Sequence, residues 1–116
     1  TLRSWFKEEG VGLGVEVHQT PAEVLRKLGD KVQLVCSHAR TDYTLMLWYQ
    51  KSPGEQTLKR IGHVNYGIIE HEKPFESNFN ITGDMSGETA KKGSLFIVDL
   101  QAEHSAVYYC AASYAH

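Results

Sequence analysis

The sequence concentrates little positive charge in any one place, which argues against a nucleic-acid-binding surface. Its 14 Asp and Glu outnumber its 12 Lys and Arg, and the formal net charge is −2. The basic residues are scattered along the chain, and the largest groups are pairs such as Lys59 with Arg60. Because recognition of phosphates needs a basic patch or stripe, we expect no nucleic acid among the partners of this chain.

Long apolar runs are lacking too. A helix that spans a bilayer needs about 20 consecutive apolar residues, and no stretch of the sequence approaches that length. Residues 1–14 do not read as a signal peptide, because Lys7, Glu8 and Glu9 stand where its apolar segment would be. We expect residues 1–14 to be an N-terminal tail, a leader remnant or other non-domain sequence, that lies outside the fold.

Cysteine is scarce: the chain contains only Cys36 and Cys110. Two cysteines cannot complete a zinc site alone, and no histidine has the spacing that would help. A free pair or one disulfide remains, and the disulfide is favoured because both cysteines end alternating apolar stretches and should point inward. Such a bond would close a loop of about 75 residues and stabilise the fold by roughly 4.5 kcal/mol. It indicates an oxidising compartment, so we expect a secreted or cell-surface protein.

Motifs for catalysis are weak or absent. Residues 10–14, GVGLG, faintly resemble a dinucleotide-binding loop, but they follow no predicted strand and open no predicted helix. The pair His71-Glu72 has no second histidine at the spacing of a metalloprotease site, and the sequence contains no Gly-x-Ser-x-Gly. A disulfide would also remove the only thiols. We therefore expect a binding protein rather than an enzyme, with no catalytic residues, no metal and no cofactor.

What the sequence does contain is apolar alternation with a period of two residues, the pattern of half-buried strands. The stretches 32–36 and 106–110 both alternate in this way. Turn residues separate such stretches, as in Ser52-Pro53-Gly54-Glu55. Only residues 22–28 read locally as helix, and so short a helix is not stable alone. The pattern predicts an all-β sandwich.

Cys36, Trp48 and the run Tyr108-Tyr109-Cys110 form the decisive set. In an immunoglobulin-like sandwich a tryptophan packs against the inter-sheet disulfide, and a tyrosine two residues before the second cysteine hydrogen-bonds back to the backbone. With Leu100 upstream, the set resembles that of antigen-receptor variable domains over residues 15–113. The resemblance implies an immunoglobulin-like V-type two-sheet β-sandwich, with Trp48, Leu100 and Tyr108 in its core and one inter-sheet disulfide.

Three segments make the sequence most similar to the variable segment of a T-cell receptor β chain: Gln19-Thr20-Pro21, Ser52-Pro53-Gly54 and Cys110-Ala111-Ala112-Ser113. The last resembles receptors of bony fish. Other receptor chains and immunoglobulin light chains remain alternatives. Since the sequence stops without Phe-Gly-x-Gly, the resemblance implies that residues 15–113 form a V-type domain with its final strand missing. Residues 114–116 would be a stub of the third hypervariable loop, as in a segment that has not been joined.

The resemblance also places a binding site on loops at one end of the sandwich. The first hypervariable loop would be residues 40–45, the second residues 63–68, and the third would begin after Cys110. Tyrosine supplies contact area at little entropic cost, and Arg or Asn adds directional hydrogen bonds. The residues expected to contact antigen are Arg40, Asp42, Tyr43, His63, Asn65, Tyr66, Ser113 and Tyr114.

Four residues, Leu47, Tyr49, Pro53 and Tyr109, are expected on or beside the sheet face opposite Trp48. Large apolar residues gathered on one exposed face indicate a buried partner surface. The resemblance implies a second receptor variable domain there, giving a heterodimer on the cell surface that reads peptide presented by major-histocompatibility (MHC) molecules. Signalling chains would act through constant and membrane regions. The rival interpretation is a non-rearranging V-type immune or adhesion receptor that uses the sheet face for a fixed ligand.

Two positions depart from the family pattern. An aspartate that usually pairs with a basic residue is replaced by His104, and the expected partner position holds Asn78. Losing both charges avoids an unpaired buried ion, so we interpret the change as a neutral substitution. A glutamine that often pairs across the two-domain interface is replaced by Lys51, with Gln50 one position earlier. The usual hydrogen bond across the interface is therefore in doubt.

The sequence contains one N-glycosylation motif, Asn80-Ile81-Thr82. Alternation predicts that Phe79 and Ile81 point inward and that Asn80 points outward, where an oligosaccharide could be attached. The two methionines are assigned by position, Met46 to the core and Met85 to a turn.

Overall fold

The computed structural model describes residues 2–8, 17–20, 23–24, 29, 31–39, 42–52, 54–87, 91–98, 101, 104 and 106–113. Its elements are β1 (Leu2–Glu8), β2 (Val17–Thr20), β3 (Glu23–Val24), β4 (Val32–His38), β5 (Leu45–Lys51), β6 (Lys59–Asn65), β7 (Ile68–His71), the 3-10 helix η1 (Lys73–Phe75), β8 (Phe79–Gly83), β9 (Lys91–Ile97) and β10 (Val107–Ser113).

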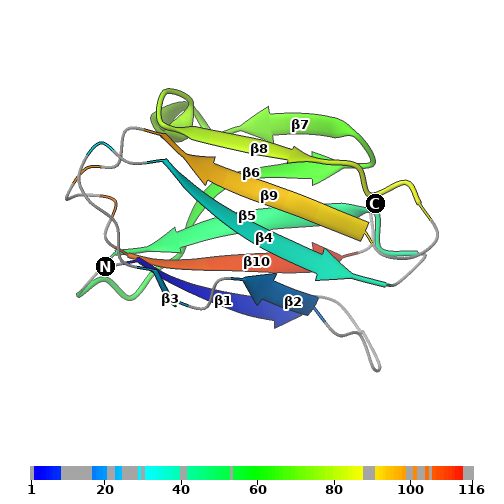
Figure 1. Ribbon diagram of the computed structural model, residues 1–116, viewed down its shortest axis with the longest axis horizontal. Helices are drawn as coiled ribbons and strands as arrows, with labels where there is room; N and C mark the ends of the chain where they lie inside the picture. Colours follow the sequence, from blue (N-terminus) through cyan, green and yellow to red (C-terminus); the bar gives the residue numbers. More distant parts are fainter. Residues whose placement is uncertain are drawn as a thin grey trace.

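These strands form two sheets that pack face to face (Figure 1). One sheet has the order β3-β1-β10-β5-β6-β7, and the other has the order β2-β4-β9-β8. The predicted all-β two-sheet sandwich is confirmed. Within the described residues, no helix is long and apolar enough to cross a membrane.

Period-two alternation determines which side chains fill the space between the sheets. In β4 and β9 every second residue is buried, and the inward residues Leu34 and Leu95 stand opposite each other in the antiparallel register. Because a strand turns successive side chains to opposite faces, each alternating strand directs every second side chain into the core.

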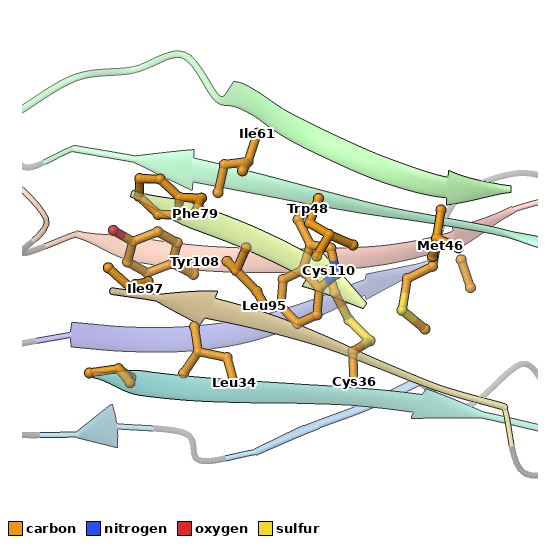
Figure 2. Packing of buried hydrophobic residues seen from close by; sticks show 14 of the residues in the cluster. Leu34, Cys36, Met46, Trp48, Ile61, Phe79, Leu95, Ile97, Tyr108 and Cys110 are labelled. Atoms are coloured by element: carbon orange, nitrogen blue, oxygen red, sulfur yellow. A yellow bond between two sulfur atoms is a disulfide. The ribbon is translucent and has the colours of Figure 1, made fainter. Parts of the chain in front are cut away.

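The core centres on the disulfide between Cys36 and Cys110, whose Cα atoms are 6.5 Å apart. Trp48 is the register partner of Cys110 and lies against the disulfide, as Figure 2 shows. Tyr108 is also fully buried, so the predicted core positions of Trp48 and Tyr108 match the structure. Leu100, the third predicted core residue, lies outside the described residues.

Met85 corrects one expectation. It was assigned to a turn, but its side chain is fully buried and belongs to the core cluster that also contains Met46. The cause is a contact between loops: the Met85 backbone N–H donates a 2.6 Å hydrogen bond to the carbonyl oxygen of Tyr66. This bond holds Met85 against the turn between β6 and β7.

The N-terminal segment gives a larger correction. Residues 1–14 were expected to lie outside the fold, yet Leu2–Glu8 form β1 inside the six-stranded sheet. β1 runs parallel to β10, from Arg3 opposite Val107 to Glu8 opposite Ala112, and it pairs with β3 along its other side. The physical reason is the open edge of β10, whose unpaired backbone groups can bind any extended segment. Residues 1 and 9–14 lie outside the described residues, so for them the expectation of a leader remnant or other non-domain sequence stays a prediction.

Candidate functional site

The start of β5, the end of β6 and the end of β10 lie at one end of the sandwich, the right-hand end in Figure 1. Ser113, Leu45 and Asn65 lie in one cross-strand row, because Ser113 pairs with Leu45 and Leu45 pairs with Asn65. β10 ends in this row, β5 begins in it and β6 ends in it. The predicted first loop, second loop and start of the third loop are therefore neighbours at one surface.

The second loop is a tight turn that is hydrogen-bonded on both sides. Tyr66 and Gly67 connect β6 to β7, and Tyr66 has a φ of 57°, in the left-handed region. Its backbone N–H donates to the carbonyl oxygen of Thr44 at 2.9 Å, and its own carbonyl accepts the bond from Met85 described above. A bulky residue reaches this backbone conformation only at a cost. The two hydrogen bonds hold it there while its side chain stays 52% exposed.

An apolar side chain stands beside this tyrosine. Ile68 is 71% exposed, and it follows the Tyr66-Gly67 turn directly. Asn65, the preceding residue, is half-buried. The loop therefore offers a large aromatic and an aliphatic surface on a fixed backbone, which is a combination suited to contact with a protein ligand.

The first loop corrects the prediction for Tyr43. Asp42 is exposed as expected, but Tyr43 has no exposed surface and belongs to the hydrophobic core. Its ring centroid lies 6.2 Å from that of His38. Burying a large aromatic side chain at the end of the core stabilises the folded state more than leaving it in water. Tyr43 therefore cannot contact antigen, and Arg40 lies outside the described residues.

Beneath the first loop lies a buried charged group that the sequence analysis did not single out. Lys91 is only 2% exposed, and its Nζ donates a hydrogen bond to the carbonyl oxygen of Tyr43 at 3.2 Å. Burial lowers the pKa of Lys91, and the charge of Asp42 opposes that shift. Lys91 is also the register partner of His38. The ammonium thus ties the start of β9 to the backbone of the first loop.

Burial and the Lys91 charge, in that order, lower the pKa of the neighbouring His38 to about 4, with Asp42 opposing. His38 is therefore neutral at physiological pH. A signal for both residues was present in the sequence. His38 continues the inward alternation of Leu34 and Cys36, and Lys91 stands two residues before the inward Gly93.

His63 was predicted to contact antigen from the second loop, but the structure places it inside β6. It stands opposite Leu47 on one side and Glu70 on the other. Its Nε2 lies 3.3 Å from a Glu70 carboxylate oxygen, and its Nδ1 lies 2.8 Å from Nη2 of Arg60. His63 is therefore part of the exposed face of the six-stranded sheet and not of the loop end.

That sheet face gathers three of the four residues predicted to meet a partner domain. Tyr49 and Tyr109 are register partners and both are partly exposed. Leu47 stands opposite Ala111, but it is only 5% exposed, so the expectation that it is an exposed partner-contact residue is wrong. Lys51 pairs with Val107 at the end of the same face. Pro53, the fourth predicted residue, lies outside the described residues. We refer to Leu47, Tyr49 and Tyr109 as the tyrosine face.

Gln50 points away from the tyrosine face. It is buried, and its Nε2 donates a 3.0 Å hydrogen bond to the hydroxyl of Tyr108. Gln50 therefore does not replace the glutamine that the family often uses across the two-domain interface. Lys51, at the matching position, is a cation that would need an acceptor on the partner.

At the opposite end of the sandwich, the Tyr108 hydroxyl donates a 2.7 Å hydrogen bond to the carbonyl oxygen of His104, as the family pattern predicts. Burial raises the pKa of Tyr108 far above its ordinary value, so the hydroxyl stays protonated. The His104 ring accepts a bond at Nδ1 from the Gln101 backbone N–H at 2.9 Å. This corner connects the segment before β10 to the sheet.

His104 and Asn78, the two departures from the family pattern, line one pocket of about 300 Å³. They do not bond to each other there. Asn78 donates from Nδ2 to the carbonyl oxygen of Val98 at 3.2 Å, and the edge of the His104 ring meets the ring of Phe79 at a centroid distance of 5.4 Å. Each residue therefore has a partner of its own in place of the usual ion pair.

Two predicted antigen-contact residues remain, Ser113 and Tyr114. Ser113 is half-buried at the end of β10, beside the first and second loops, whereas Tyr114 lies outside the described residues. No group of three or more His, Cys, Asp or Glu side chains that could hold a metal ion is found within the described ranges. The described residues present surfaces for contact at the loop end and on the six-stranded sheet.

Comparisons with known proteins agree with this geometry. The family model of the immunoglobulin V-set domain matches residues 19–116. A curated relative, the Ig kappa chain V region K-25 of Oryctolagus cuniculus, is 30% identical over 96 residues, which is 83% of this chain and 81% of the relative.

A similar chain also occurs in a solved structure described as "Structural basis of T cell specificity and activation by the bacterial superantigen toxic shock syndrome toxin-1". It superposes with a TM-score of 0.75 at 26% sequence identity, covering 89% of this chain and 85% of that one. The similarity thus extends to an antibody V region and to a chain in a structure that concerns T-cell specificity and activation by a superantigen.

Proposed function

This chain belongs to the immunoglobulin V-set family, and from that premise we propose that it is the antigen-recognition variable domain of a T-cell receptor β-type chain. In this proposal it binds without catalysing a reaction, since V-set domains are generally not enzymes. The domain acts at the cell surface, which it reaches through the secretory pathway. Its ligand is a peptide presented by an MHC molecule.

The observation that carries the proposal is the shared row of Ser113, Leu45 and Asn65, which brings together the strand ends next to the three predicted loops. A single row means that the three loops can touch one ligand at the same time. The exposed Tyr66 on its hydrogen-bonded turn supplies the rigid aromatic contact that such a surface needs. Lys91 stabilises the first loop from below, so the surface is largely formed before the ligand arrives.

The tyrosine face supports the second half of the proposal, a heterodimer with another receptor variable domain. Tyr49 and Tyr109 are amphipathic residues of the kind that is enriched at interfaces, and they lie side by side across β5 and β10. A partner domain that covers this face would place its own loops next to those of this chain. Constant regions and associated signalling chains would then transmit the binding event.

The β-type assignment rests on the segments 19–21, 52–54 and 110–113, and the last of these also suggests an origin in a bony fish. A second candidate is supported by the rabbit kappa relative, namely an immunoglobulin light-chain variable domain. Both candidates use the same loop end and the same tyrosine face, so the choice between them concerns the partner and the ligand class.

The deciding experiment is to sequence lymphocyte transcripts and genomic DNA beyond the codon of His116. The proposal predicts many different joins near Ser113, each followed by Phe-Gly-x-Gly and then by a receptor β constant region. A light-chain constant region after the joins would select the second candidate. A single invariant continuation into a stalk or membrane segment would contradict both and support a non-rearranging receptor.

A further inference from the structure

The outer face of the four-stranded sheet carries an aromatic residue that neither the core nor the binding surfaces use. Phe96 lies on β9 between inward-facing Leu95 and Ile97, and it is only partly buried. Its register partner on β4 is Gln33, and its register partner on β8 is Asn80. The three residues therefore form one cross-strand row on the side of the sheet that faces away from the other sheet.

Asn80 is accessible to solvent within this row. It is exposed, and β8 is an edge strand of its sheet, so no further described strand lies beyond it. Its neighbours Phe79 and Ile81 are 5% and 1% exposed, which confirms that they point inward and Asn80 points outward. Asn80 also begins the sequence Asn-Ile-Thr, in which Thr82 supplies the required hydroxyl.

We propose that Asn80 carries an N-linked oligosaccharide whose first sugar packs against the ring of Phe96. The inference rests on the secretory route in the proposed function. The oligosaccharide donor is a lipid-linked diphosphate sugar. A new bond joins Nδ2 of Asn80 to the anomeric carbon, the bond from that carbon to the phosphate oxygen breaks, and the lipid diphosphate leaves. The amide nitrogen loses one proton.

The register supplies the reason why the first sugar meets Phe96. Directly opposed residues on one sheet face have Cβ atoms about 4.5–5.5 Å apart, so a sugar on Asn80 begins beside the ring. The electron-rich face of an aromatic ring attracts positively polarised groups. This ring already does so, since Nζ of Lys31 lies 4.9 Å from its centroid. Lys31, the residue before β4, reaches the ring from one side, and the sugar would reach it from β8 on the other.

Such an oligosaccharide would also cover the backbone edge of β8. Exposed edge strands invite pairing with other chains, and a bulky hydrophilic group prevents that. Because the oligosaccharide would occupy the outer face of the four-stranded sheet, protein partners would be directed to the tyrosine face and the loop end.

The test for attachment uses the chain secreted from a eukaryotic cell line behind a supplied signal sequence. We expect treatment with a peptide:N-glycosidase to lower its mass and convert Asn80 to aspartate, as peptide mass spectrometry would show. Thr82→Ala should abolish the mass change, whereas the matched control Thr82→Ser keeps the hydroxyl and should retain it. Secretion of folded protein that carries no sugar on Asn80 would overturn the proposal.

The test for packing compares protein trimmed to one sugar with protein that has none. We expect the single sugar to raise the Tm of the unsubstituted chain, and to raise it much less in Phe96→Ser, which keeps the motif. An equal rise in both would overturn the contact with Phe96. Since the signal sequence is supplied, a negative result here leaves the receptor proposal standing. Conversely, invariant transcripts would contradict the receptor proposal and leave the oligosaccharide in place.

Discussion

At the base of the first loop, a buried cation, a neutral imidazole and an exposed carboxylate interact electrostatically. Lys91 and His38 are register partners at the ends of β9 and β4, and Asp42 interacts with both electrostatically. The His38 pKa is lowered from 6.5 to about 4. Between these pH values His38 is protonated in the unfolded chain but neutral in the folded protein. This difference makes the stability of the domain depend on pH.

We expect the contribution of His38 to stability to be complete above pH 6.5 and to be lost as the pH falls toward 4. A shift of this size corresponds to about 3 kcal/mol in the free energy of unfolding. Urea titrations at several pH values would measure the loss. In His38→Gln the dependence over this window should largely disappear, and an unchanged dependence in that variant would assign it to another group.

Tyr43 and Tyr66 make a matched pair for testing which loop residues hold the fold. Tyr43 is fully buried and Tyr66 is half-exposed. Tyr43→Ala should lower the free energy of unfolding by about 3–5 kcal/mol, as for other buried aromatic residues. Tyr66→Ala should change it by about 0.5 kcal/mol or less. Chemical denaturation of both variants would measure the difference, and equal losses would show that Tyr43 does not belong to the core.

The sequence alone could not predict that Tyr43 is buried and Tyr66 is exposed. Both stand in predicted loops, and composition gives them the same expected role. What separates them is tertiary structure: Tyr43 meets the open end of the sandwich, while the turn at Tyr66 is held outward by bonds to Thr44 and Met85. Neither contact is local in the sequence, so alternation and turn chemistry could not distinguish them.

At the scale of elements, β6 passes close to β7 at Gly62. A Cβ at this position would lie 2.3 Å from the backbone oxygen of Glu70 and 2.8 Å from Cδ1 of Ile81. The register between β5 and β6 also shifts beside it, between Trp48 and Tyr49. The glycine therefore permits the approach of two strands.

Gly62→Ala should destabilise the domain by about 1–3 kcal/mol or more, because backbone must move to admit the methyl group. Gly67→Ala is the control, since the nearest atom to a Cβ there would be Cγ of Asp84 at 3.7 Å, an ordinary contact. Thermal unfolding would compare the two. If Gly67→Ala lowered Tm as much as Gly62→Ala, the close approach would not be the cause.

Strands whose side chains alternate between core and surface were predictable from the sequence, and β1 was not. β4, β5 and β10 alternate because the core selects every second side chain, and their cysteines and Trp48 identified the family. β1 is paired through its backbone with β10 and β3. Backbone pairing imposes little on side-chain type, so residues 2–8 carried no signal that alternation could detect.

At the scale of the whole molecule, β1 closes the six-stranded sheet beside β10. We expect deletion of residues 1–8 to expose the edge of β10 and to cause concentration-dependent association, measured by light scattering. Phe6→Pro should act in the same direction, because proline cannot donate a ladder hydrogen bond. If both variants remained monomeric at concentrations where the full chain is monomeric, the edge would need no protection.

The tyrosine face allows a test of pairing that leaves the monomer intact. Tyr109→Arg places a charge on a partly exposed position opposite Tyr49, so monomer Tm should change little. Its affinity for a receptor α variable domain should fall by at least about 2 kcal/mol, as expected when an aromatic interface residue is lost. Surface plasmon resonance would measure this, and Asn80→Gln on the other sheet is the control. Unchanged affinity in Tyr109→Arg would move the partner surface elsewhere.

The parallel direction of β1 has a practical consequence. β1 begins beside Val107 at the start of β10, whereas the loops gather near Ser113 at the far end of that strand. In Figure 1 the two lie at opposite ends of the sandwich. A biotin tag, a fluorophore or a display anchor fused ahead of β1 would therefore hold the domain by its base and leave the recognition surface facing the solution.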